Sequence, residues 1–397
     1  MDLILFILCL IPVSVLSINF FSVILTWFYQ KHHYPKTIRP KFDQKLKPFC
    51  SLIIAVKGTS STLDKHLKSF IAQKYSNYEI IFAVESKTDP AYQHIKKVIS
   101  GHRHAKLVVA HSCRLCSQKN QNLLTALNHT NHPEILVFAD ADITVQNNWL
   151  TELILPLSDP NITATTSYYW PKISFNSIGE LFFLFNSTII FSLLCFASSF
   201  MKFSLLWGGS IAIRHKTFEK LKVAKYWSRS VSDDTSLSKI LSDNNHQTLF
   251  VPTAVSLSTT HSADFDTYNR WYFRQLMYLK LYRKRIWFFI FGLLNLYYFI
   301  FYFWFVISFS LSQFDEYTFR QFGGYIPTVF IAIEMILASL HALLGPIPKY
   351  PLYIILSPYF RLVQIFGYMT TYLTNRITWS GITYQTTSDG RVIKIKK

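Results

Sequence analysis

Long uninterrupted runs of apolar residues occupy both ends of the chain. The first, residues 3–29, contains no charged residue, and it exceeds the roughly 20 apolar residues that a helix needs to cross a bilayer. Near the other end, residues 286–310 and 325–344 are apolar over comparable lengths. The pattern predicts a transmembrane anchor at residues 1–30 and a transmembrane or interfacial region at residues 286–375.

Two further apolar runs fit a bilayer less well. Residues 181–207 are long enough to cross, but a crossing there would put the acidic residues before and after it on opposite sides of the membrane. We interpret this run as an interfacial or re-entrant segment on the acceptor side. Residues 350–373 contain two prolines, an arginine and a glutamine. We interpret them as interfacial too, with a fourth crossing as the alternative.

Between the two ends, short apolar strands alternate with helical stretches. Strands are predicted at residues 52–56, 79–84, 106–110 and 135–139, and helices at residues 63–73, 122–127 and 235–241. Alternation at this spacing is typical of a doubly wound parallel sheet. The sequence therefore predicts an α/β domain with a Rossmann-like, mostly parallel sheet over residues 31–285.

Basic residues gather beside the apolar runs. Six Lys or Arg lie between residues 31 and 47, and four lie between residues 280 and 285. By the positive-inside rule, both ends of the central domain face the cytosol. We predict an integral, multi-pass membrane protein with a cytosolic domain, followed by a basic cytosolic tail at residues 376–397.

Composition agrees with a membrane protein and excludes one class of partner. The chain has 397 residues, of which 50% are hydrophobic and 17% aromatic, more than an ordinary soluble domain carries. Its net charge of +18 is explained by anionic membrane lipids, which attract basic residues beside the spans. Because no zinc-finger, helix-turn-helix or RNA-binding signature accompanies the charge, we expect no nucleic-acid partner.

The cysteines do not form a disulfide framework. The five are Cys9, Cys50, Cys113, Cys116 and Cys195. A cytosolic domain keeps its thiols reduced, so all five are expected to be free. The pair Cys113 and Cys116 lacks the second ligand pair of a zinc site, and we interpret it as part of a loop that leads to the next motif.

Acidic residues follow the predicted strands in order along the domain. Asp140 and Asp142 come directly after the strand at residues 135–139, and residues two apart on an extended chain share a face. Open α/β sheets bind ligands at such strand ends, and carboxylate oxygens suit Mg²⁺ or Mn²⁺. The cation would in turn bridge the diphosphate of a nucleotide sugar. The other motifs, in chain order, are Asp89, Asp233-Asp234 and Arg270-Trp271.

This set of motifs resembles the ceramide glucosyltransferases and the related bacterial hopanoid-associated glycosyltransferases, membrane members of the GT-A superfamily in glycosyltransferase families 21 and 2. The resemblance runs from about residue 50 to about residue 275. It is carried by residues 55–58 (Ala-Val-Lys-Gly), 84–91 (Val-Glu-Ser-Lys-Thr-Asp-Pro-Ala), 119–123 (Lys-Asn-Gln-Asn-Leu), Asp140, Asp234 and Arg270-Trp271. It implies a GT-A fold, a UDP-sugar donor and a lipid acceptor.

The resemblance also implies a role for each matched residue. Asp89 contacts the nucleotide, Lys119 faces its diphosphate, and Asp234 is the catalytic base. Asp140 is the second acidic position of the family, and Asp142 completes a metal-binding pair with it. The predicted substrate-binding and nucleotide-binding set is Lys57, Asp89, Lys119, Asp140, Arg270 and Trp271.

The last motif departs from the family pattern. Thr267 stands where the family has Gln or Arg, three residues before Arg270. Arg274 and Gln275, one helical turn further on, are candidates to replace it in part. Residues 377–384 resemble the Trp-x-Gly-x-x-Tyr tail that is common in bacterial members.

Each of these residues also has a purely structural alternative. Asp234 stands before a predicted helix and would serve there as a cap. Asp89 before a proline is typical of a turn. Arg270 is alternatively an interfacial arginine beside a span, and Lys119 an ordinary solvated lysine.

Displacement at an anomeric carbon needs a base near the acceptor oxygen and neutralisation of charge on the departing diphosphate. With Asp234 as base, the resemblance implies an inverting enzyme that transfers glucose from UDP-glucose to the hydroxyl of a lipid such as ceramide. The alternatives are transfer of N-acetylglucosamine to a hopanoid or other bacterial lipid, a processive polysaccharide synthase and, without catalysis, a lipid transporter or scaffold.

Overall fold

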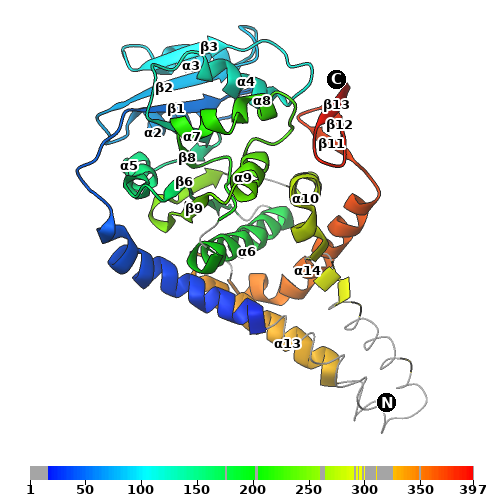
Figure 1. Cartoon of the computed structure of the whole chain (residues 1–397). Helices are drawn as coiled ribbons and strands as arrows, with labels where there is room; N and C mark the ends of the chain where they lie inside the picture. Colours follow the sequence, from blue (N-terminus) through cyan, green and yellow to red (C-terminus); the bar gives the residue numbers. More distant parts are fainter. Residues whose placement is uncertain are drawn as a thin grey trace.

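The computed structural model describes residues 17–174, 177–201, 204–259, 264–289, 292–293, 295–296, 299, 310, 325–347 and 350–396. An α/β domain lies on one side of a group of long helices, and a small C-terminal sheet lies beside helix α10 (Phe265–Tyr282) (Figure 1).

In the described part of the chain, the central sheet has seven strands in the order β3-β2-β1-β4-β8-β6-β9. Their bounds are β1 Cys50–Ala55, β2 Tyr78–Val84, β3 Ala105–Val109, β4 Ile135–Asp140, β6 Ile162–Thr166, β8 Ile211–Arg214 and β9 Gln247–Phe250. Strands β3, β2, β1 and β4 run parallel, whereas β8 is antiparallel to both of its neighbours. The four predicted strands form the parallel half, so the predicted α/β fold with a mostly parallel sheet is confirmed.

Alternate residues of the parallel strands enter two separate cores. On β1, Leu52 and Ile54 belong to one buried cluster and Ile53 to the other, as the two-residue period of a strand requires. One face is covered by α2 Leu63–Ile71, α3 Ala91–Val98 and α5 Trp149–Ile154, and the other by α4 Gln118–Leu127, α7 His215–Lys220, α8 Val223–Trp227 and α9 Asp234–Asp243. The sheet is therefore covered on both faces.

A long apolar helix, α6 (Ile178–Met201), packs between the domain and the helices below it (Figure 1). It begins three residues before the segment predicted as interfacial and is mostly buried in protein. Among the described residues, two helices are long and apolar enough to cross a membrane, α6 over residues 178–199 and α14 (Tyr350–Tyr372). Helix α14 exposes several large apolar side chains, including Ile355 and Phe366.

The predicted terminal spans are described in part. Residues 17–28 are helical and continue into the π-helix η1 (Tyr29–Ile38). Helix α13 (Tyr325–Leu340) occupies the predicted span at residues 325–344. Residues 1–16 and most of the predicted span at residues 286–310 lie outside the described residues.

Residues 376–396, for which the sequence predicts a tail, form a sheet. Strands β11 (Arg376–Trp379), β12 (Ile382–Thr386) and β13 (Val392–Lys396) pair antiparallel in that order. A second small sheet has the order β5-β10-β7, with β5 at Ile143–Thr144, β10 at Ser256–Thr259 and β7 at Tyr169–Lys172.

Candidate active site

The carboxyl ends of β1, β2 and β4 meet at one edge of the sheet. Ala55 of β1 is paired with Ala83 of β2 and with Asp140 of β4. The loops that follow these strands therefore begin side by side, where open parallel sheets bind ligands. Three of the predicted motifs start here, at Lys57, at Asp89 and at Asp140.

Asp89 joins two of these loops. Its Oδ1 accepts hydrogen bonds from the backbone N–H of Gly58 and of Ala91, both at 2.9 Å. The hydrogen bond from Ala91 closes a turn at Asp89, which is the structural role that the sequence offers as an alternative to nucleotide binding. Gly58, which follows the exposed Lys57, has a left-handed φ of +68°, a conformation that suits glycine. The structure thus brings Asp89 to the Lys-Gly motif, and its nucleotide contact stays a prediction.

Lys119 lies at the centre of the acidic residues. It is on the first turn of α4, which Ser117 caps by accepting a backbone hydrogen bond. Its Nζ lies 2.6 Å from Asp140 Oδ1 and 3.0 Å from Asp233 Oδ2, and its side chain is 14% exposed. Burial opposes the charge, but Asp140, Asp233 and Asp234 together hold the pKa of Lys119 above its usual value. Lys119 is therefore not a solvated surface lysine.

Asp234 accepts hydrogen bonds at both of its carboxylate oxygens. Its Oδ1 accepts hydrogen bonds from Ser232 Oγ at 2.6 Å and from Thr235 N at 2.5 Å. Its Oδ2 accepts a hydrogen bond from Gly208 N at 2.9 Å. The N-cap residue of α9 is Asp233, and its side chain makes no capping bond, so the structure does not show the carboxylate cap that the sequence offers as an alternative. Because a carboxylate oxygen accepts more than one hydrogen bond, Oδ2 remains suited to a substrate hydroxyl.

Asp233, the residue before Asp234, is buried. Burial raises its pKa, Lys119 lowers it, and Asp234 and Asp140 raise it again, to about 6. Three carboxylates therefore crowd around Lys119 and leave the cluster with surplus negative charge.

Asp142 lies on the solvent side of the same cluster. Although its side chain contacts solvent, the surrounding protein and then the charge of Asp140 raise the pKa of Asp142 to about 6. Two carboxylates that disfavour each other's charge fit a divalent cation that takes its other ligands from water and phosphate. Within the described residues, no group of three or more His, Cys, Asp or Glu side chains is placed to hold a metal ion.

The sequence analysis missed Gly208 and Gly209, which precede β8. A Cβ on Gly208 would lie 2.9 Å from both Asp233 Oδ2 and Lys119 Nζ, and a Cβ on Gly209 would lie 2.2 Å from the ring of Trp207. Both positions therefore need glycine for close approach. The signal in the sequence is a glycine pair in a chain that has only 12 glycines.

We expect Gly208→Ala to lower the rate of the reaction at this site by about 10²-fold, because the added methyl group displaces Lys119 and Asp233 from their present positions. Gly292→Ala is the matched control, since its Cβ would meet no atom within 4 Å. Steady-state kinetics of the two variants test this expectation, and equal rates would contradict it.

Arg270 and Trp271, the two residues of the last motif, lie on helix α10 and make their contacts with residues outside the acidic cluster. Arg270 is 66% exposed, and its Nη1 lies 2.6 Å from Asp266 Oδ2 on the same helix. Trp271 packs against Phe183 of α6, with ring centroids 4.9 Å apart. The roles of Arg270 and Trp271 in substrate binding stay predictions. Arg274, one turn further on, is close enough to lower the pKa of Asp142.

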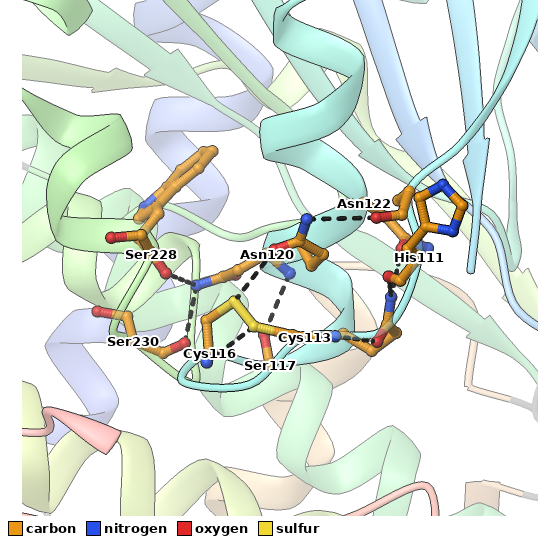
Figure 2. Close-up of a disulfide and its surroundings, with 12 residues drawn as sticks. His111, Cys113, Cys116, Ser117, Asn120, Asn122, Ser228 and Ser230 are labelled. Carbon is orange, nitrogen blue, oxygen red and sulfur yellow. Dashed lines mark hydrogen bonds between the residues drawn. A yellow bond between two sulfur atoms is a disulfide. The ribbon is translucent and has the colours of Figure 1, made fainter. Parts of the chain in front are cut away.

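The loop before α4 contains a disulfide bond between Cys113 and Cys116 (Figure 2). The expectation that all cysteines are reduced is therefore wrong for this pair. The physical reason is a tight loop, in which the backbone N of Cys116 lies 2.9 Å from Cys113 Sγ. The predicted position of the pair, in a loop that leads to the next motif, is confirmed.

We expect iodoacetamide to label Cys50 and Cys195 in the denatured, unreduced protein, and to label Cys113 and Cys116 only after reduction. Peptide mass spectrometry reads out both states. Because reducing compartments keep thiols free, a disulfide in protein alkylated within cells would argue against the predicted cytosolic orientation, and free thiols at both positions would support it. Label on Cys113 before reduction would contradict the disulfide.

The mostly parallel sheet, with acidic groups at its carboxyl edge, resembles the fold of GT-A glycosyltransferases. Residues 10–392 match the model of glycosyl transferase family 21, so the chain belongs to that family. The resemblance to the ceramide glucosyltransferase family noted from the motifs is thereby confirmed.

The solved structure of a mannosyltransferase supports the fold, and a second solved structure is similar over a smaller part of this chain. A mannosyltransferase from Pyrobaculum calidifontis, in complex with GDP-Man and Mn²⁺, is 16% identical with a TM-score of 0.54, covering 92% of this chain and 97% of its own. S. aureus TarS residues 1–349, in complex with UDP-GlcNAc, is 13% identical with a TM-score of 0.40, covering 86% of this chain and 98% of its own. A comparison with curated proteins gives no match.

Proposed function

We propose that the protein is a membrane-bound, inverting glycosyltransferase that transfers one sugar, glucose from UDP-glucose, to the hydroxyl of a lipid such as ceramide. The observation that carries this proposal is the contact of Lys119 with Asp140 and Asp233 at the carboxyl edge of the sheet. It places a buried cation, a carboxylate pair and the candidate base Asp234 in one cluster, which is what displacement of a nucleoside diphosphate requires.

The base is Asp234. Its Oδ1 is anchored by Ser232 and Thr235, so its Oδ2 points in a fixed direction to take the proton of the acceptor hydroxyl. A single displacement by that hydroxyl inverts the anomeric carbon.

The leaving diphosphate is stabilised by positive charge. Lys119 supplies a buried cation, and Asp140 and Asp142 would hold Mg²⁺ or Mn²⁺, which supplies further neutralisation of the phosphate charge. Asp142 suits a metal ligand because its side chain is exposed and because its pKa is raised. The mannosyltransferase with a similar fold contains Mn²⁺ and GDP-Man, which supports a metal and a nucleotide sugar for this chain.

The acceptor is a lipid because apolar helices lie next to the domain. Helix α14 exposes Ile355, Phe366 and Met369, as expected for a helix in contact with lipid. The buried helix α6 reaches from this region to the domain core through Phe191 and Leu194. We propose a multi-pass membrane protein with residues 1–30 as anchor, residues 31–285 as the cytosolic catalytic domain and residues 286–375 as the membrane region.

Two alternatives keep the same catalytic domain. One is transfer of N-acetylglucosamine to a hopanoid or another bacterial lipid, and the other is a processive polysaccharide synthase. A synthase usually has an intact Gln-x-x-Arg-Trp motif, whereas this chain has Thr267 at the first position. Membership of a glycosyltransferase family argues against a lipid transporter or scaffold.

Mass spectrometry of reaction products tests the proposal. Purified protein is incubated with Mn²⁺ or Mg²⁺, a panel of UDP-sugars, and ceramide, diacylglycerol or a bacterial lipid extract. We expect a lipid that carries one hexose, formed from UDP-glucose and ceramide. Product from another pair of substrates would reassign the sugar or the lipid, a polymer would support the synthase, and no product with any pair would overturn the proposal.

A further inference from the structure

We propose that Cys113 and Cys116 form a reversible thiol–disulfide exchange site for small thiols, and that opening of this disulfide weakens donor binding by loosening the start of helix α4, which carries Lys119. This inference rests on the proposed function, in which Lys119 faces the diphosphate of the nucleotide sugar. The two cysteines are positioning residues, because they act on the donor only through Lys119.

The disulfide is accessible through one of its two sulfur atoms. Cys113 is half-buried, whereas Cys116 is 1% exposed. The two residues between them, Arg114 and Leu115, are exposed. Because exchange depends on the access of a thiolate to a sulfur, the attacked atom is Cys113 Sγ and the leaving atom is Cys116 Sγ. The exposed guanidinium of Arg114 attracts thiols that carry negative charge, such as glutathione.

Each thiolate that the exchange releases has a stabilising group beside it. Cys116 directly precedes Ser117, the N-cap of α4, and the amino end of a helix favours a thiolate. Cys113 Sγ accepts a hydrogen bond from Cys116 N at 2.9 Å. A first small thiol forms a mixed disulfide with Cys113 while Cys116 leaves, and a second one attacks the sulfur of the bound small thiol and releases Cys113. In total the protein disulfide gains two electrons and two protons, and the two small thiols lose them to form one disulfide.

Hydrogen bonds join the cysteine loop to the first turn of α4. Gln118 Oε1 accepts a hydrogen bond from Cys113 N at 3.0 Å, and Gln118 Nε2 donates to His111 O at 2.8 Å. Figure 2 shows the disulfide in the loop that leads into this turn. Lys119 is the second residue of the helix, so its backbone lies within the turn that the loop holds.

The same turn is bonded to the loop that leads to Asp233. Ser230 O accepts hydrogen bonds from Ser117 N and from Asn120 Nδ2, both at 3.0 Å. Between these two anchors, Lys119 Nζ lies 3.0 Å from Asp233 Oδ2. The position of the lysine in the acidic cluster therefore depends on the order of this turn.

Opening of the disulfide returns conformational freedom to the backbone of residues 113–116. Because helix ends fray, and because the cap Ser117 directly follows the released segment, the first turn of α4 becomes less ordered. A wider spread of Lys119 positions then weakens its contact with the diphosphate. The hydrogen bonds of Gln118 remain, so we expect a loss of about 5-fold in donor affinity, the low end of the range for coupling between two sites.

Calorimetric binding of UDP to the full-length protein, at a series of ratios of reduced to oxidised glutathione, tests the proposal. We expect UDP to bind about 5-fold more weakly once the disulfide is open and to regain its affinity on reoxidation with oxidised glutathione. Because coupling is reciprocal, saturating UDP should make the disulfide harder to open by the same factor. Iodoacetamide labelling and peptide mass spectrometry measure the open fraction in each sample. The KM for the lipid should not change.

Two variants separate the disulfide from other effects of thiols. Cys113→Ser, at the half-buried position, should bind UDP with the affinity of the open form and should not respond to glutathione. Cys195→Ala removes a buried free cysteine and should respond as the wild type does. A response that persists in Cys113→Ser, or that disappears in Cys195→Ala, would overturn the proposal.

Hydrogen exchange of the wild type tests the structural step without a ligand. The backbone N–H of Asn120 donates to Ser117 Oγ at 3.1 Å, and this bond caps α4. We expect that N–H to exchange about 5-fold faster after the disulfide has opened, because the turn then opens locally more often. The measurement carries the test should Cys113→Ser fail to fold, and an unchanged exchange rate would overturn the inference.

Failure of this inference is distinguishable from failure of the proposed function. If the protein binds no UDP in either redox state, the proposed function fails, and exchange at Asn120 still decides whether the disulfide controls the first turn of α4. If UDP binds equally well in both states, the function stands and the inference is overturned. A disulfide that stays closed at every glutathione ratio would likewise overturn it.

Discussion

Asp234→Asn is expected to lower the turnover number for sugar transfer by about 10³-fold, within the range that general base catalysis contributes, while UDP binding stays close to wild type. The amide has the shape of the carboxylate but cannot take a proton. Its oxygen can keep the hydrogen bonds that Oδ1 accepts from Ser232 and Thr235. The amide nitrogen then faces Gly208 N–H, so one hydrogen bond is lost, at a cost of about 1 kcal/mol of stability. The variant therefore folds and loses the chemical step.

Asp243→Asn is the matched control. Asp243 ends the same helix, is exposed and pairs with Lys239, so its loss should leave turnover unchanged. Single-turnover experiments with saturating donor separate the chemical step from binding. Retained turnover in Asp234→Asn, with loss in Asp233→Asn, would move the role of base to Asp233.

The parallel half of the sheet could be predicted because its strands are continuous apolar runs followed by loops. Strands β8 and β9 were not predicted. Each is four residues long, and β8 ends in Arg214, so neither shows a period that can be told from chance. The C-terminal sheet was missed for a different reason. Its apolar residues alternate with polar and basic ones, a pattern that also suits a solvated tail. The apolar face of the sheet packs against α10, which lies far earlier in the sequence.

The candidate site, too, could be predicted only where it depends on local sequence and not on tertiary packing. Strand order alone predicts that Asp89 and Asp140 meet at one edge. The contact of Lys119 with Asp233 could not be predicted from spacing, since it depends on how α4 and α9 pack on the same face of the sheet. The surroundings of Arg270 and Arg274 could not be predicted either, because the two residues lie one turn apart on one helix. Arg270 pairs with Asp266 at the surface, whereas Arg274 lies over the ring of Trp379, which is far away in the sequence.

Lys119→Met is expected to combine the largest loss of stability with a loss of donor binding. Removing one partner from a buried ion pair costs about 3 kcal/mol or more, because the remaining charges are left without compensation. Here Asp140 and Asp233 both lose their nearest cation. Loss of a charged hydrogen bond to the diphosphate should also weaken UDP binding by about 10- to 100-fold. Chemical unfolding and calorimetry measure the two effects separately.

The dependence of the stability loss on pH tests its cause. Lys119 lowers the pKa of Asp233, which stands at about 6 with the lysine present. Without the lysine, that pKa rises further, so the folded variant takes up a proton more readily than the unfolded chain does. Its stability therefore increases as the pH falls, and the deficit relative to wild type should shrink as the pH falls towards about 6 and become constant below it, where Asp233 of the wild type takes up its proton too. Lys239→Met, which removes only an exposed pair with Asp243, should cost less than about 1 kcal/mol and should show no such recovery. A deficit in Lys119→Met that is independent of pH would mean that lost packing, rather than uncompensated carboxylate charge, accounts for the instability.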